Sequence, residues 1–142
     1  MRYLIDANAL ISLGLEDHAF HSRVESWLGS LQKGQDELAV CAITELAFVR
    51  ILAQLPGIDV TVADAKRQLA EMKSRSALSF VFLADDRGVG RLPSWVKTAK
   101  QTTDGHLADL ARSHGSVLAT LDRKIPGAFV IPELPETQQP KS

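Results

Sequence analysis

Short apolar runs that alternate with helix-length segments are the feature that most constrains how this chain can fold. Strands are predicted at residues 2–6, 38–41, 79–83, 116–120 and 128–131. Helices are predicted at residues 8–15, 17–31, 43–55, 62–76 and 103–113. Apolar strands alternating with helices form a parallel sheet that is covered on both faces. The expected fold is therefore an α/β three-layer sandwich, α/β/α, around a central, mostly parallel sheet of short strands.

The length and composition suit a single globular domain. The chain has 142 residues, of which 45% are hydrophobic and 23% charged, and this mix excludes wholesale disorder. Its net charge of −1 means that any nucleic-acid binding must depend on a local basic patch. Residues 1–132 are expected to form the domain. Residues 133–142 have little to bury and are expected to form a flexible C-terminal tail.

Three further features bear on the compartment and on the chemistry that is available. The single cysteine, Cys41, excludes an internal disulfide and a cysteine-based zinc cluster. The longest apolar stretch, residues 46–63, is interrupted by charged residues and a proline, so it does not predict a membrane span. Asp6 lies where a secretory signal would have its apolar core. We therefore expect a cytoplasmic protein without a membrane partner.

Four acidic residues are expected at one edge of the predicted sheet. Asp6 ends the first strand, and Asp122 comes soon after the apolar run at 117–119. Glu45 and Asp104 each lie near the start of a helix and are followed by apolar residues at i+3, i+4 and i+7. Each of these two carboxylates therefore shares the apolar stripe of its helix. Ligands of parallel sheets bind beyond the carboxyl ends of the strands, which is where these four acids should converge.

A cluster of carboxylates is stabilised by a bound cation. Like charges repel, and burial of an ionised carboxylate is costly unless it is paired or binds a metal. Mg²⁺ and Mn²⁺ accept a few carboxylates together with water and phosphate oxygens, and such ions promote phosphodiester hydrolysis. Each acid taken alone also has a structural explanation, as a helix cap, a dipole partner or a turn residue. Both readings of the individual residues remain open at this point.

Four segments resemble the motifs of PIN domains. Residues 4–11, LIDANALI, resemble the opening of such a domain. Residues 103–111, TDGHLADLA, resemble its third acidic motif, and residues 118–123, LATLDR, its fourth. Residues 44–46, TEL, fit the second acid at its helix start. The chain length and motif order are similar to those of VapC-like toxins of bacterial toxin–antitoxin pairs. The resemblance covers the chain except for its tail.

This resemblance implies a Mg²⁺- or Mn²⁺-dependent ribonuclease that leaves a 5′-phosphate and a 3′-hydroxyl. It implies metal-binding and catalytic roles for four carboxylates: Asp6, Glu45, Asp104 and Asp122. Asn8 would orient neighbouring groups, and Thr120 would support Asp122 or a bound water. The family also implies an RNA substrate, a cognate antitoxin that covers or distorts the site, and a homodimer. Whether one or two metal ions act stays open.

The candidate contacts to RNA lie in the more basic half of the chain. Residues 87–124 carry a net charge of +4, whereas residues 1–86 carry −4. Arg123 and Lys124 directly follow a proposed site residue and are the preferred contacts to RNA phosphates. Arg87 and Arg91, in a glycine-bearing loop, are further candidates, although a solvated turn explains them equally well. Asp109 and His106 are expected to be surface residues.

Two other functions compete with a nuclease. A metal-dependent phosphatase of the haloacid dehalogenase type needs a second aspartate two residues after the first, and this chain has Asn8 there. A non-catalytic module that binds RNA or a partner protein would retain the acids without cleaving RNA. The sequence leaves this second alternative open, because the same residues would serve both functions.

Overall fold

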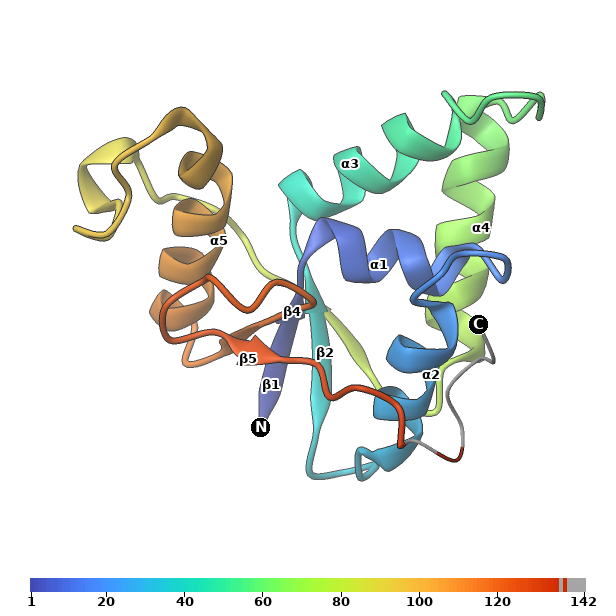
Figure 1. Ribbon diagram of the computed structural model, residues 1–142, viewed down its shortest axis with the longest axis horizontal. Helices are drawn as coiled ribbons and strands as arrows, with labels where there is room; N and C mark the ends of the chain where they lie inside the picture. The colour runs from blue at the N-terminus through green and yellow to red at the C-terminus, as the bar shows by residue number, and fades with distance from the viewer. Residues whose placement is uncertain (136, 138–142) are drawn as a thin grey trace.

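The computed structural model describes residues 1–135 and 137 and confirms the predicted fold class. Figure 1 shows a central sheet with helices on both sides. Its elements in chain order are β1 (Arg2–Ile5), α1 (Ala7–Gly14), α2 (His21–Ser30), β2 (Glu37–Val40), α3 (Ala42–Leu52), α4 (Val62–Arg75), β3 (Phe80–Phe82), η1 (Val89–Arg91), η2 (Ala99–Gln101), α5 (Thr102–Ser113), β4 (Val117–Thr120) and β5 (Phe129–Val130). Within the described residues the sheet has five strands in the order β3-β2-β1-β4-β5, and every pairing is parallel.

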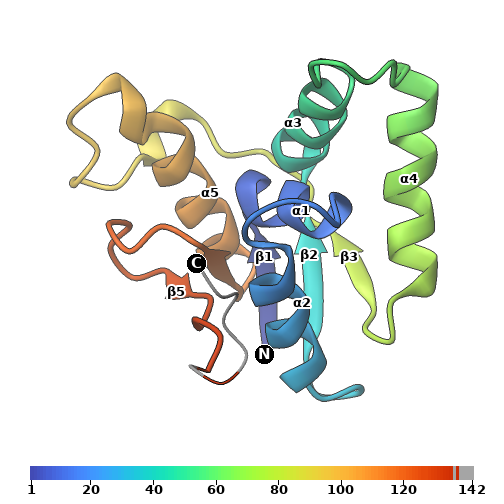
Figure 2. The same ribbon diagram turned by 45° about the vertical axis from the view of Figure 1, so that its right-hand side comes forward.

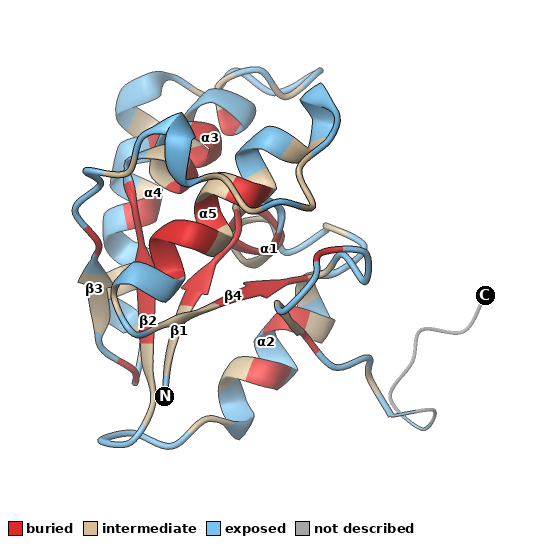
Figure 3. Ribbon diagram, turned by 90° about the vertical axis from the view of Figure 1, so that its left-hand side faces the viewer, coloured by how far each residue is buried: buried red, intermediate tan, exposed pale blue. Residues whose placement is uncertain are grey.

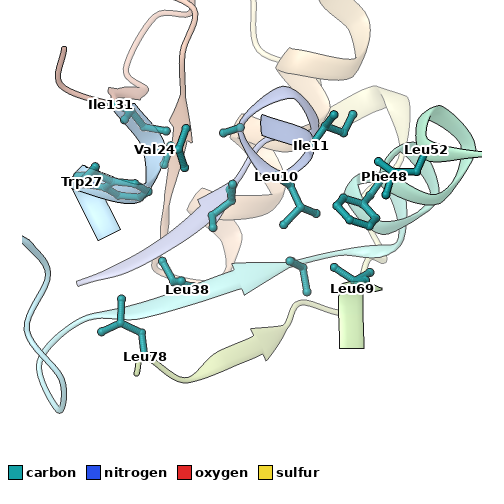
Figure 4. Packing of buried hydrophobic residues seen from close by; sticks show 14 of the residues in the cluster. Leu10, Ile11, Val24, Trp27, Leu38, Phe48, Leu52, Leu69, Leu78 and Ile131 are labelled. Carbon is teal, nitrogen blue, oxygen red and sulfur yellow. The ribbon is translucent and has the colours of Figure 1, made fainter. Parts of the chain in front are cut away.

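The two faces of the sheet bury separate hydrophobic clusters. Helices α1 to α4 cover one face, where Phe48, Trp27 and Leu69 are buried against strand residues (Figures 1, 2 and 4). Helix α5 covers the other face with Leu107 and Leu110. Adjacent residues of the central strands point to opposite clusters, and these strands are the most buried part of the sheet (Figure 3). The sandwich therefore consists of three layers, as predicted.

The register of the central strands determines which residues meet at the carboxyl edge. Strands β1 and β4 pair so that Ile5 lies opposite Ala119. The Asp6 backbone N–H continues this pairing by donating to the Ala119 carbonyl at 3.0 Å. Asp6 consequently emerges from the sheet next to the end of β4, where Thr120 and Asp122 follow.

The structure differs from the prediction mainly at the ends of elements and in one connection. Helix α2 begins at His21, four residues later than predicted, because a turn in which the Phe20 N–H donates to His18 Nδ1 precedes it. Cys41 caps α3 together with Thr44 and does not extend the second strand. The predicted loop at 85–94 contains η1, and η2 leads directly into α5.

The predicted boundary between the domain and the tail at residue 132 stays a prediction. Ile131 is fully buried, and Arg23 binds its carbonyl oxygen through Nε at 3.1 Å. Of the predicted tail, residues 136 and 138–142 lie outside the described residues. Within the described part of the chain, each helix is too short or too polar to cross a lipid bilayer.

Gly105 determines how closely the connection before α5 packs on that helix. A Cβ at this position would overlap Val96 Cγ2 and lie 3.5 Å from Pro93 Cδ. Alanine in a helix is favoured over glycine by about 1 kcal/mol, but overpacking costs about 1–3 kcal/mol. We expect Gly105→Ala to lower the free energy of unfolding in urea, and Val96→Ala to restore part of the loss when added to it. A Gly105→Ala protein more stable than the wild type would contradict this packing.

Candidate metal centre

Asp6 is fixed at the junction of β1, β4 and α1. It caps α1, since its Oδ1 accepts the Ala9 N–H at 2.8 Å. Its Oδ2 accepts the hydroxyl of Thr120 at 2.5 Å. The residue is only 6% exposed. A buried carboxylate is thus held in one orientation by a backbone donor and a side-chain donor from two different elements.

Thr120 connects Asp6 to Asp122. Its hydroxyl donates to Asp6, and its Oγ1 accepts the Asp122 N–H at 3.0 Å. Asp122 Oδ1 in turn accepts the Lys124 N–H at 2.8 Å. Thr120 is fully buried, so its two hydrogen bonds are shielded from water. This position suits the supporting role predicted for Thr120, which itself stays a prediction.

Asp104, in the first turn of α5, completes a group of three acids. Burial raises the pKa of Asp6, which its two hydrogen bonds oppose, and the charges of Asp104 and Asp122 raise it further. Burial and the charge of Asp122 likewise raise the pKa of Asp104. We call Asp6, Asp104 and Asp122 the acidic triad. Asp6 follows β1, Asp104 lies in α5 and Asp122 follows β4, and their charges are near enough to affect one another's pKa values.

The chemistry of the acidic triad fits a hard divalent cation. All its donor atoms are carboxylate oxygens, which Mg²⁺ and Mn²⁺ prefer, and a cation would relieve the mutual repulsion. Among the described residues, no group of three His, Cys, Asp or Glu side chains is placed so that it could hold a metal ion. Binding of an ion would therefore require these carboxylates to change their arrangement.

Glu45, the fourth predicted acid, is held by a different helix. Its carboxylate forms an ion pair with Lys73 of α4. Sequence reasoning missed Lys73. Lys73 lies four residues after Leu69, which is buried in α4. This spacing indicates that the aliphatic part of the Lys73 side chain lies beside the apolar stripe of the helix. A role of Glu45 as a metal ligand stays a prediction.

The other predicted site residues lie outside the acidic triad. Asn8 is exposed in the first turn of α1, and Lys124 and Arg91 are exposed as well. Arg123 is 69% exposed and forms an ion pair with Glu133. Its predicted contact with RNA would have to replace this pair.

The prediction that Asp109 is a solvated surface charge is wrong. Its side chain is 2% exposed and accepts two hydrogen bonds from Arg87, at 2.8 and 3.1 Å. Arg87, and to a lesser extent Arg112, hold the pKa of Asp109 below its ordinary value. The reason is the connection at 84–101, which packs on the side of α5 that the sequence analysis assigned to solvent. Arg87 is thus engaged inside the protein, and a contact with RNA would require this pair to open.

His106, predicted to be a surface residue, is partly exposed and pairs with an acidic residue that the sequence did not indicate. Its side chain is 17% exposed, and its Nε2 lies 2.5 Å from Asp85 Oδ2. The hydrogen bond to His106 lowers the pKa of Asp85, although burial opposes the shift. His106 and Asp109 together attach the start of the 84–101 connection to α5.

The order of the motifs and the parallel sheet agree with a comparison to known families. A family model of the PIN domain matches residues 3–128. The chain belongs to the PIN-domain family. Ribonuclease VapC38 of Mycobacterium tuberculosis is 34% identical to it over 143 residues, which cover 98% of this chain and 93% of that protein. Ribonuclease VapC29 of the same organism is 35% identical over 127 residues, or 86% of each chain. The VapC-like resemblance of the sequence is thereby confirmed.

Solved structures show the same fold at lower sequence identity. The toxin VapC20 of Mycobacterium tuberculosis, described as cleaving the sarcin–ricin loop, matches with a TM-score of 0.58 at 14% identity. The match covers 93% of this chain and 99% of that chain. FitAcB of Neisseria gonorrhoeae matches with a TM-score of 0.55 at 22% identity, over 92% of this chain and 96% of that chain. These structures support the three-layer fold.

Proposed function

We propose that this protein is a divalent-metal-dependent endoribonuclease and the toxin of a toxin–antitoxin pair. The observation that carries this proposal is the acidic triad at the carboxyl edge of a PIN-family sheet. Relatives that cover nearly the whole chain are named ribonucleases. The RNA substrate, the cognate antitoxin, a homodimer and a cytoplasmic location are part of the proposal. Neighbouring structures of VapBC from Rickettsia felis and Haemophilus influenzae support a partner protein.

The residues would divide the work as follows. The acidic triad, joined by Glu45, would hold Mg²⁺ or Mn²⁺, which activates water and offsets charge on the phosphodiester. Asp6 is oriented by the Ala9 N–H and by Thr120, and each of its oxygens keeps a lone pair that can face an ion. Arg123 and Lys124 follow Asp122 directly and would neutralise phosphates of the bound RNA.

The test of this function is cleavage of RNA by the purified protein in Mg²⁺, in Mn²⁺ and in EDTA. We expect cleavage with either metal, none in EDTA, and products with 5′-phosphate and 3′-hydroxyl ends. RNA binding without cleavage in any metal would instead identify a non-catalytic module. Cleavage that persists in EDTA would contradict the role of the acidic triad.

Thr120 provides a test of how the acidic triad is supported. Thr120→Val keeps the shape of the side chain but removes the donor to Asp6 and the acceptor for the Asp122 N–H. Loss of a hydrogen bond that orients a ligand typically costs about 10–100-fold in metal affinity. We expect Mn²⁺ affinity, measured by titration, to fall about 10-fold, and Thr120→Ser to retain it. Unchanged affinity in a folded Thr120→Val protein would show that the hydroxyl has no such role.

A further inference from the structure

Lys73 stands where it can control the fourth predicted metal ligand. Its ammonium group pairs with the Glu45 carboxylate, and the two side chains are 32% and 25% exposed. Both line a cavity of about 600 Å³ between α3 and α4, which is otherwise formed mostly by apolar side chains such as Val49 and Phe82. Apolar surroundings strengthen the attraction between the opposite charges.

The pair gives Glu45 a cation while no metal is bound. In the acidic triad, by contrast, mutual repulsion and burial raise the pKa values of Asp6 and Asp104. Glu45 is half-buried on α3, whose buried residues include Phe48 and Leu52, and it lines the cavity. A lone carboxylate at this position would be costly, and Lys73 removes that cost.

We propose that Lys73 competes with the divalent ion for Glu45. Glu45 joins the acidic triad only when its pair with Lys73 opens, so the strength of the pair lowers the apparent metal affinity. This inference rests on the proposed function, because it takes Glu45 as a ligand of the same metal. The ion and the lysine are alternative cations for one carboxylate, and capture of the first releases the second.

The neighbouring lysine provides a matched control. Lys66 lies seven residues before Lys73, which places it two turns away on the same face of α4, and it lines the same cavity. The ion pair recorded for Glu45 is the one with Lys73. Lys66→Met therefore removes one positive charge from the same surface and leaves the pair intact. Methionine suits both positions, since its stem resembles that of lysine and the cavity is largely apolar.

The experiment measures Mn²⁺ binding alone, by electron paramagnetic resonance, in the full chain. The proteins are the wild type, Lys73→Met, Lys66→Met, Glu45→Gln and the double variant of Glu45 and Lys73, each checked for folding by circular dichroism. We expect Lys73→Met to bind Mn²⁺ about 3–10-fold more tightly and Lys66→Met to change the affinity less than about 2-fold. In the Glu45→Gln background, Lys73→Met should have little effect, because the competition is gone.

Three results would overturn the inference. These are unchanged or weaker binding in a folded Lys73→Met protein, an equal gain in the Glu45→Gln background, and an equal gain in Lys66→Met. The last two would mean that loss of positive charge alone explains the effect. A wild type and a Lys73→Met protein that both fail to bind Mn²⁺ would contradict the proposed metal site itself. Binding that appears only in Lys73→Met would support the competition in its strongest form.

Discussion

Asp6→Asn should abolish RNA cleavage while leaving the metal-free fold at least as stable as the wild type. Asparagine caps a helix as well as aspartate, so the hydrogen bond from the Ala9 N–H survives. A neutral amide, however, is a far weaker ligand for Mg²⁺ than a carboxylate. Removal of a group on which the metal and the reacting phosphate depend lowers turnover by about 10³-fold or more.

The stability of the same variant should depend on pH in a defined direction. Burial raises the folded-state pKa of Asp6 above its ordinary value of 3.8. The folded protein therefore favours the protonated form, and the free energy of unfolding of the metal-free wild type falls as pH rises through the raised pKa. The neutral side chain of Asp6→Asn does not ionise, so the variant does not lose stability in this way as pH rises. In EDTA at neutral pH we therefore expect its free energy of unfolding to equal that of the wild type or to exceed it by up to about 1 kcal/mol.

The measurement is urea unfolding in EDTA at several pH values between 4 and 8, with a parallel series in Mg²⁺. An ion that binds only the folded state should stabilise the wild type and not the variant. An Asp6→Asn protein that unfolds more easily than the wild type in EDTA would show that the carboxylate serves the fold and is not a costly functional group.

Arg87→Ala should have the largest effect on stability. Asp109 is almost completely buried and accepts two hydrogen bonds from Arg87, at 2.8 and 3.1 Å. Removal of Arg87 leaves the buried carboxylate with only the exposed Arg112 as a partner, and loss of one partner of a buried ion pair costs about 3–5 kcal/mol. That is a large part of the total stability of an ordinary domain, about 5–15 kcal/mol. The connection at 84–101 would also lose its attachment to α5.

Arg112→Ala provides the matched control. Arg112 also pairs with Asp109, at 3.3 Å, but its side chain is 79% exposed. We expect its loss to cost less than about 1 kcal/mol in urea unfolding at neutral pH. Hydrogen bonds from Arg87, and to a lesser extent from Arg112, hold the pKa of Asp109 in the folded protein below 3.8. The stability that ionised Asp109 contributes is therefore present above pH 3.8 and is lost as pH falls through the folded-state pKa. Equal effects of the two substitutions would contradict the distinction between a buried and an exposed partner.

Much of the fold could be predicted because the central strands bury both faces. The predicted bounds of strands β1 and β4 agree with the structure within one residue at each end. Short continuous apolar runs are typical of strands that are buried on both faces of a parallel sheet. Asp6 and Asp122 could be placed at the carboxyl edge for the same reason. The topology brings the ends of neighbouring parallel strands together, whatever the lengths of the connections.

Pairs between elements that pack through irregular segments could not be predicted. Arg87 lies in the 84–101 connection, whose path has no periodic signal in the sequence, and its partner Asp109 lies in α5. Glu45 was predicted on the apolar side of its helix, and its side chain is half-buried in the structure. Whether that side faces the acidic triad or α4 depends on how α3 is rotated about its axis, and periodicity leaves a range of rotations open.

The central claim is that the acidic triad binds a divalent cation. The most direct measurement is the anomalous scattering of Mn²⁺ in crystals of the wild type and of Asp6→Asn grown with that ion. We predict a peak in the wild type within coordination distance of Asp6, Asp104 and Asp122, and no peak there in the variant. A fully occupied Mn²⁺ elsewhere on the protein, with these three carboxylates left in contact with water only, would contradict the account.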